Sequence, residues 1–248
     1  MPNRDSIIKT EREEIARFFN VESPQVPDLQ DWVDDGLIQY WNDHLFHVHY
    51  LPRVSLDENM DVPLWRERPS EQFYKKIREG KIREEAKNLP GTWILIDARD
   101  KPTKKVPWIR KTDVWLFEKL GFHPKTYLKK WSAQSHQREY INAVLKERGF
   151  GSRFCLSLSE IDELKPFILE FLKIDKSKTI RLPHFIEYNY LGNAFYPQWG
   201  TTKTWEWFED IFDDSQHLAG GSGSVRAIGW DPPDYWSTIL TFRPVIEL

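Results

Sequence analysis

Apolar residues recur along this chain with two different periods. In residues 5–21 and 27–41 they return every three or four positions among charged neighbours, which predicts two amphipathic helices. Residues 44–51 alternate between apolar and more polar side chains, as a half-buried strand does. Such a strand would place His47 and His49 on the same face. The start of the chain therefore predicts two helices followed by a strand.

A change of pattern near residue 88 indicates a domain boundary. Residues 57–69 are polar and contain prolines, which predicts a loop, and the charged residues 70–87 have a helical pattern. The sequence Leu-Pro-Gly then interrupts that helix, and residues 92–97 form an apolar run typical of a buried strand. We therefore expect a mainly helical N-terminal segment with one strand, residues 1–88, packed on a main domain of residues 89–248.

The main domain begins with helical patterns and ends without them. Helices are predicted over residues 111–120, 124–148 and 159–172. From Trp199 onward, glycine, tryptophan, threonine and serine become frequent and helix signals are few. This part of the chain therefore predicts short strands joined by long loops.

Charge and cysteine content exclude several classes of function. The net charge of -3 favours neither a nucleic-acid-binding protein nor one that binds an anionic membrane. The single cysteine, Cys155, cannot form an intrachain disulfide, and we expect it to be buried and unreactive. No apolar run approaches the ~18 residues of a membrane span, and the first 20 residues lack the apolar core of a secretory signal. The cytoplasm is thus the default location, although a signal-free export route stays open.

Three short motifs follow one another in the last third of the chain. Arg-Leu-Pro at 181–183 comes first, with Glu-Tyr at 187–188 and Tyr-Pro-Gln-Trp-Gly at 196–200 behind it. Trp-Glu-Trp-Phe-Glu-Asp follows at 205–210. Gly-Gly-Ser at 220–222 is the third, and Phe-Arg-Pro lies near the end at 242–244. In this order they resemble the formylglycine-generating, sulfatase-modifying enzymes, whose domain has a C-type-lectin-like fold.

The resemblance covers residues 89–248 and implies an α+β fold. It implies a small twisted antiparallel sheet with long ordered loops, flanked by helices at 159–172 and 183–191. The strand at 92–97 should pair with the strand that carries Phe242 and Arg243. The sequence departs from the family pattern just before Phe242, where the family usually has glycine.

Most of the matching residues are expected to hold the scaffold. Trp205 and Trp207 would bury large apolar areas, and Gly220 and Gly221 would allow a bulge or a close backbone approach. Four charged residues would join buried or half-buried ion pairs: Arg181, Glu206, Glu209 and Arg243.

The same resemblance argues against catalysis. The oxidase branch of the family needs a redox-active cysteine pair near the C-terminal end, and that region has no cysteine here. An iron-dependent branch, the sulfoxide synthases, needs histidines, and His44, His47 and His49 form a cluster. No carboxylate spacing completes a metal triad, so ordinary packed or surface histidines are favoured. We assign no catalytic residue, metal or cofactor, and a divergent metal-dependent enzyme remains the alternative.

A third relationship points to binding. The variable proteins of diversity-generating retroelements have a similar succession, in which a hypervariable stretch lies between the double glycine and the terminal Phe-Arg pair. Here that stretch, residues 222–241, lacks lysine, glutamate, glutamine and methionine, as template-adenine mutagenesis of asparagine codons would leave it. Trp230 and Trp236 count against every position being varied. The alternative interpretation is a loop that is rich in serine, proline and aspartate by chance.

The resemblance therefore implies a non-catalytic display protein with a protein or other macromolecule as partner, and with no nucleic acid bound and no membrane insertion. An accessory domain that only docks onto neighbours is a further possibility. The candidate ligand-binding residues are Ser222, Ser224, Arg226, Ile228, Trp230, Asp231, Asp234, Tyr235, Trp236, Ser237, Ile239 and Thr241.

Overall fold

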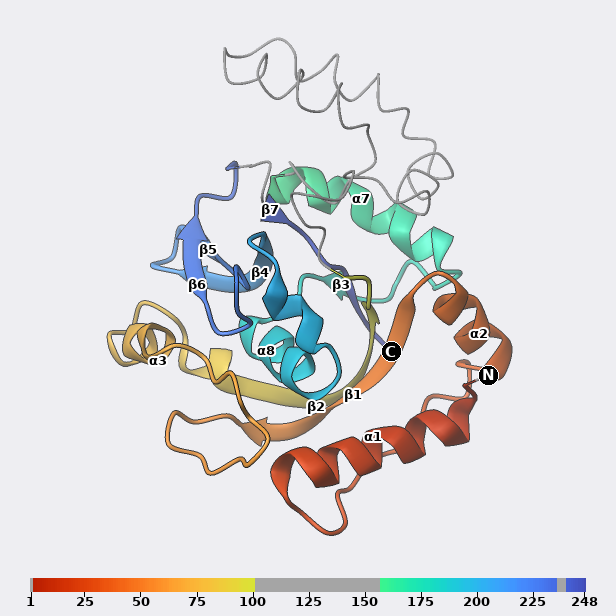
Figure 1. Ribbon diagram of the computed structural model, residues 1–248. Coiled ribbons are helices and arrows are strands. Elements are labelled where there is room, and N and C mark those ends of the chain that lie inside the picture. Colours follow the sequence, from red (N-terminus) through yellow and green to blue (C-terminus); the bar gives the residue numbers. More distant parts are fainter. Residues whose placement is uncertain (1, 101–156, 236–239) are drawn as a thin grey trace.

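The computed structural model describes residues 2–100, 157–235 and 240–248 (Figure 1). These residues form a mixed α+β structure. The helices are α1 (Arg4–Phe19), α2 (Asp35–Asp43), α3 (Glu71–Arg78), α7 (Leu158–Phe171) and α8 (Phe185–Ala194), with 3-10 helices η1 (Glu84–Lys87) and η2 (Pro197–Thr201). The strands are β1 (Phe46–Ser55), β2 (Asn88–Asp97), β3 (Ile180–Arg181), β4 (Trp205–Phe212), β5 (Gln216–Gly220), β6 (Ile228–Asp231), β7 (Leu240–Thr241) and β8 (Val245–Glu247).

The strands form two four-stranded sheets. The first has the order β1-β2-β8-β3 and is antiparallel throughout. Its longest pair is β1 with β2, in register from Phe46 opposite Asp97 to Ser55 opposite Asn88. The second sheet has the order β6-β5-β4-β7, and β7 runs parallel to β4. Strand β1 thus joins residues before position 88 to the sheet of the following domain.

Helix α8 lies between the two sheets and contacts β2 on one side and β4 and β5 on the other (Figure 1). Eight of its ten residues are buried, because a helix with neighbours on all sides needs no polar face. Phe185 packs against Phe208 of β4 at a centroid distance of 5.3 Å. Phe18 of α1 meets Tyr190 edge-on at 5.1 Å. Helix α8 is therefore the centre of the packing.

Helices α2 and α7 pack on each other through hydrogen bonds as well as apolar contacts. The indole N–H of Trp41, a residue with no exposed surface, donates to the carbonyl oxygen of Leu172 at 2.8 Å. The Tyr40 hydroxyl donates to the carbonyl oxygen of Phe171 at 2.7 Å. These bonds satisfy two of the carbonyls that a helix leaves unpaired at its C-terminal end.

Several predicted elements are confirmed. The helix predicted at 5–21 is α1, which begins after Asn3, whose side chain accepts the Ser6 N–H at 2.9 Å. The strands predicted at 44–51 and 92–97 correspond to β1 and β2, and the helices predicted at 159–172 and 183–191 correspond to α7 and α8.

Two predicted helices are partly wrong. The one predicted at 27–41 begins only at Asp35, because the Asp34 side chain accepts the Leu37 N–H at 2.7 Å and so caps the helix there. The helix predicted at 70–87 ends at Arg78, since Gly80 adopts a positive φ of 69°. The helices predicted at 111–120 and 124–148, and Cys155, lie outside the described residues.

The predicted sheet topology is also wrong in detail. Besides β1, the partner of β2 is β8, whereas Phe242 and Arg243 lie between β7 and β8, in no strand. The chain leaves the second sheet at Thr241 and enters the first at Val245, so one predicted sheet is in fact two. Within the residues that the structure describes, no helix is both long and apolar enough to cross a membrane.

Candidate functional site

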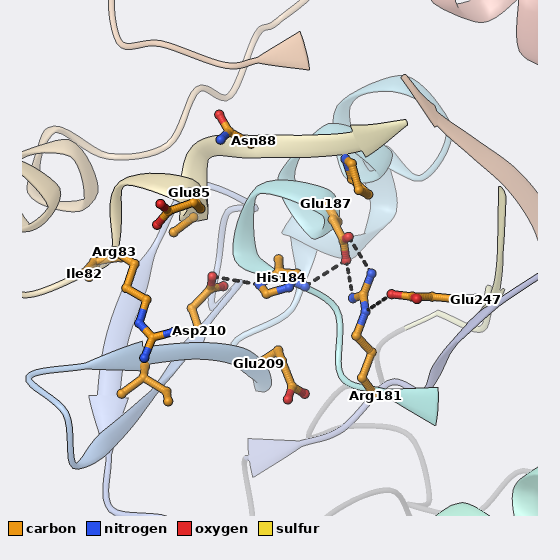
Figure 2. A pocket seen from close by; sticks show the side chains of 13 residues that line it. Ile82, Arg83, Glu85, Asn88, Arg181, His184, Glu187, Glu209, Asp210 and Glu247 are labelled. Carbon is orange, nitrogen blue, oxygen red and sulfur yellow. Dashed lines mark hydrogen bonds and ion pairs between the residues drawn. The ribbon is translucent and has the colours of Figure 1, made fainter. Parts of the chain in front are cut away.

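A cavity of about 730 Å³ opens between the start of β2, the N-terminus of α8 and strand β4 (Figure 2). Its lining residues come from η1, β2, β3, α8, β4 and β8, and thus from both sheets. It lies where α8 begins, and the carboxylates of Glu187 and Asp210 accept the His184 and Phe185 N–H groups, which have no partner within the helix. Two ion pairs meet there.

The first pair joins Arg181 of β3 to Glu187 of α8. The guanidinium NH1 and NH2 groups donate to the two carboxylate oxygens, each at 2.7 Å, and the Nε–H donates to Glu247 at 2.8 Å. The Glu187 side chain is fully buried. Burial alone would raise the pKa of Glu187, but the charge and hydrogen bonds of Arg181 hold it below its usual value. Glu187 therefore stays ionised inside the protein.

The second pair joins His184, the residue before α8, to Asp210 of β4. The His184 Nδ1 lies 2.9 Å from one Asp210 oxygen, and the other Asp210 oxygen accepts the Phe185 N–H at 2.6 Å. Burial lowers the pKa of His184, but the hydrogen bond and the charge of Asp210, aided by the charge of Glu187, outweigh it and raise the pKa. Asp210 thus fixes the imidazole with Nδ1 toward itself.

Chemically, the cavity combines charged groups with apolar surface. Glu209 is half-buried, and one of its oxygens accepts the Leu182 N–H at 3.1 Å. Arg83 and Glu85 are exposed at the rim, and the Ile211 side chain is 37% exposed in the wall. The sequence motifs contain Arg181, Glu187, Glu209 and Asp210, for which only scaffold roles were expected. No sequence signal distinguished His184, Arg83 or Glu85.

The predicted ligand-binding residues fall into four groups. Arg226, Asp234 and Tyr235 are exposed, and Ser222, Ser224, Trp230 and Asp231 are half-buried. Ile228 and Thr241 are buried, with 8% and 1% of their surface exposed, so the expectation that they face a ligand is wrong. Both lie in strands, β6 and β7, whose inner faces pack on the core. Trp236, Ser237 and Ile239 lie outside the described residues.

The segment that carries these residues is fastened to the rest of the fold by Glu67. The Glu67 carboxylate accepts the Ser224 hydroxyl at 2.6 Å and the Val225 N–H at 3.0 Å. Further along, Trp230 stacks on Phe212 of β4 at a centroid distance of 4.2 Å. The backbone of this segment therefore depends on residues outside it, and Glu67 carried no signal in the sequence.

The ion pairs expected for Arg181, Glu206 and Arg243 are confirmed, whereas Glu209 accepts the Leu182 N–H and forms no ion pair among the described residues. Arg243 and Glu206 are both fully buried and form a bidentate pair, with bonds of 2.9 and 2.8 Å. A Cβ added at Gly220 would collide with the carbonyl oxygen of Ala227, so this position needs glycine. Trp207 has no exposed surface, whereas Trp205 is only half-buried and contributes less to the core than expected.

Two of the three clustered histidines come together. His47 Nδ1 and His49 Nε2 lie 2.8 and 2.6 Å from the Tyr196 hydroxyl, and His49 Nδ1 lies 2.7 Å from a buried oxygen of Glu11. His44 instead contacts the carbonyl oxygen of Tyr40. Among the residues with described positions, no group of three His, Cys, Asp or Glu side chains is arranged to hold a metal ion. His47 and His49 thus belong to a hydrogen-bonded chain that links Glu11 of α1 to Tyr196, the residue before η2.

The chain matches none of the protein-family models, curated proteins and solved structures with which it was compared. What the cavity and the segment around Tyr235 do must therefore be inferred from their own geometry and chemistry.

Proposed function

We propose that this chain is a non-catalytic binding protein with a formylglycine-enzyme/C-type-lectin-like domain, which presents residues 222–241 to a protein or other macromolecule. The observation that carries this proposal is a separation of roles along the segment. Arg226, Asp234 and Tyr235 are exposed, while the backbone beneath them is held by groups elsewhere in the fold, above all Glu67.

Because of this separation, substitutions of the exposed side chains should reduce the stability of the fold very little. Val225, near the start of the segment, is 2% exposed, β6 pairs with β5 further along, and β7 at the far end pairs with β4. Substitutions of exposed side chains that make no such contacts change stability by no more than about 0.5 kcal/mol. A protein that displays variable side chains needs this property.

The exposed residues are also chemically suited to recognition. Tyr235 is 43% exposed and offers a rigid amphipathic ring. Arg226 and Asp234 add charges of both signs, and Pro232 and Pro233 restrict the backbone between them. A segment with little freedom loses little conformational entropy when it binds.

The scaffold supports the family resemblance as well. The Arg181–Glu187 pair lies within the first motif, and the Arg243–Glu206 pair joins the third motif to the second. The Arg243 guanidinium also lies over the Trp199 ring of the first motif, 3.8 Å from its centroid. Buried ion pairs of this kind fix long loops that lack regular hydrogen bonding. We therefore include the lectin-like fold in the proposal.

A matched pair of libraries tests the binding function. One library randomises Arg226, Asp234 and Tyr235, and the other randomises Ile228 and Thr241 within the same segment. Both are displayed on yeast and selected against hen egg lysozyme as a defined probe. The exposed library should stay folded and yield binders, whereas the buried library should lose folded display. Equal loss of folded protein from both libraries would contradict the proposal.

A genetic observation tests the origin of the variation. Sequencing of the 3′ coding end in many cells should show changes confined to codons 222–241. A reverse transcriptase gene and a near-copy of that coding end should lie nearby. Absence of both would remove the diversity-generating part of the proposal. Iron or copper retained at one equivalent and traced to His47 and His49 would instead support the metal-dependent alternative.

A further inference from the structure

The cavity at the start of α8 has an excess of negative charge. Five carboxylates and two guanidinium groups line it, together with His184. Arg181 and Glu187 neutralise each other, and Asp210 is engaged by His184. An excess of carboxylates in a partly enclosed space attracts cations, because low-dielectric walls focus the field.

Acceptor atoms of Glu209 and His184 in the cavity have no donor among the described residues. The Glu209 Oε2 atom accepts the Leu182 N–H, which leaves Oε1 without a partner. Asp210 occupies the Nδ1 atom of His184, so at a pH above the raised pKa the neutral imidazole presents the lone pair of Nε2 to the cavity. A carboxylate oxygen and an imidazole nitrogen together suit a ligand that donates several N–H bonds.

The apolar part of the lining offers contacts that an inorganic ion would not make. Ile82 and Ala86 are buried beside the cavity, and Ile211 exposes 37% of its surface there. Methylene groups pack against such surface while a charged end remains hydrogen-bonded, as the stems of lysine and arginine do. A volume of about 730 Å³ also exceeds what a bare ammonium ion would fill.

We propose that this cavity is a second binding site, separate from residues 222–241, for an aliphatic amine or guanidinium group. The nitrogen donates to Glu209 and His184, and the methylene chain lies against Ile211. The ligand is a basic side chain of a peptide or a free polyamine, since both present this chemistry. Within the described lining, Arg181 is already paired with Glu187, so only the guanidinium of Arg83 is available to an anion. Anions are therefore disfavoured.

Three ligands of equal chain length test the charge requirement. We would titrate 1,5-diaminopentane, 1,5-pentanediol and glutarate into ¹⁵N-labelled full-length protein at pH 8 and low salt. The diamine should bind saturably, at least tenfold more tightly than the diol, with shifts confined to residues around α8 and β4. Glutarate should not bind. Absence of saturable diamine binding, or equal binding of diamine and diol, would overturn the proposal.

Matched variants locate the site. Glu209→Gln keeps an oxygen for the Leu182 N–H and should weaken diamine binding at least tenfold, whereas Glu13→Gln, on the exposed face of α1, should leave it unchanged. Glu85→Gln, at the exposed rim, should weaken binding several-fold with an unchanged melting temperature. This variant therefore tests the site even if Glu209→Gln fails to fold. Equal effects of the Glu209 and Glu13 substitutions would show adventitious binding only.

A fourth titration distinguishes the two sources of ligand. The capped tripeptide Ala-Lys-Ala presents one lysine side chain with a backbone on either side of it. Tighter binding of the tripeptide than of the diamine assigns the cavity to a basic side chain, and the reverse assigns it to a polyamine. Weaker binding of both than of the diol would refute the site.

Discussion

Replacement of Arg181 by methionine should destabilise the protein by about 3–5 kcal/mol at pH 7, because it leaves the carboxylate of Glu187 buried without its counter-charge. Glu187 has no exposed side-chain surface and takes both of its strongest hydrogen bonds from Arg181. Glu247, the other partner of Arg181, is 42% exposed and will be solvated when released.

The cost should depend on pH in a defined direction. Without Arg181, burial raises the pKa of Glu187 in the folded variant above the value of about 4.3 in the unfolded chain. The folded variant then binds a proton that the unfolded chain does not, so its stability falls as pH rises through the raised pKa. The difference between wild type and Arg181→Met should therefore shrink as pH is lowered from 7 toward 4.

A double-mutant cycle separates the lost pair from the lost packing. Glu187→Gln removes the charge but keeps an oxygen for the His184 N–H, which Glu187 accepts at 2.9 Å. The double variant should be more stable than Arg181→Met alone, because no unpaired charge is buried in it. Urea unfolding of the four proteins at pH 7 and pH 5, with the slope checked for constancy, provides the free energies. A cost below about 1 kcal/mol for Arg181→Met, or a double variant no better than the single one, would refute this reasoning.

Three further predictions concern the core, the displayed segment and pH. Trp207→Ala should cost about 3–5 kcal/mol in thermal unfolding, and Trp205→Ala clearly less, because only Trp207 is fully buried; equal losses would contradict the assignment. Glu67→Ala should cost about 1.5–3 kcal/mol through its two charge-assisted bonds, with Glu67→Gln milder, as measured by urea unfolding. Burial, and then the nearby His49, lower the pKa of His47 from 6.5 to about 4. The unfolded chain therefore binds a proton at this position first, and stability should fall by up to about 3 kcal/mol between pH 6.5 and 4, an effect that His47→Gln should remove.

Periodic segments of the fold could be predicted from the sequence, and very short ones could not. Helices α1, α7 and α8 and strand β1 span several turns or alternations, so their patterns stand out. Strands β7 and β8 have two and three residues, and the division between two sheets depends on contacts that no pattern of three residues encodes. The error over Phe242 and Arg243 has this origin.

The candidate sites show the same limit more strongly. Glu67 is 157 positions from Ser224, and Glu11 is 38 positions from His49, so neither partnership leaves a local signal. The motifs did indicate that Arg181, Glu206 and Arg243 form ion pairs, because charged residues at buried scaffold positions must pair. They did not indicate that Glu209 and Asp210 also face a cavity, which depends on where η1 and β4 lie relative to each other.

The crossing of the chain between its two sheets sets where the polypeptide can change length. Strand β6 ends at Asp231, strand β7 begins at Leu240, and both belong to the second sheet. The residues between them therefore connect two fixed points. Doubling the length of such a connection costs only about 0.6 kcal/mol in loop closure. After Thr241 the situation reverses, since three residues lead into β8 of the other sheet and one of them is the fully buried Arg243. One inserted residue there would turn every side chain of β8 to the wrong face. Insertions are thus compatible with the fold between Asp231 and Leu240 and incompatible with it between Thr241 and Val245.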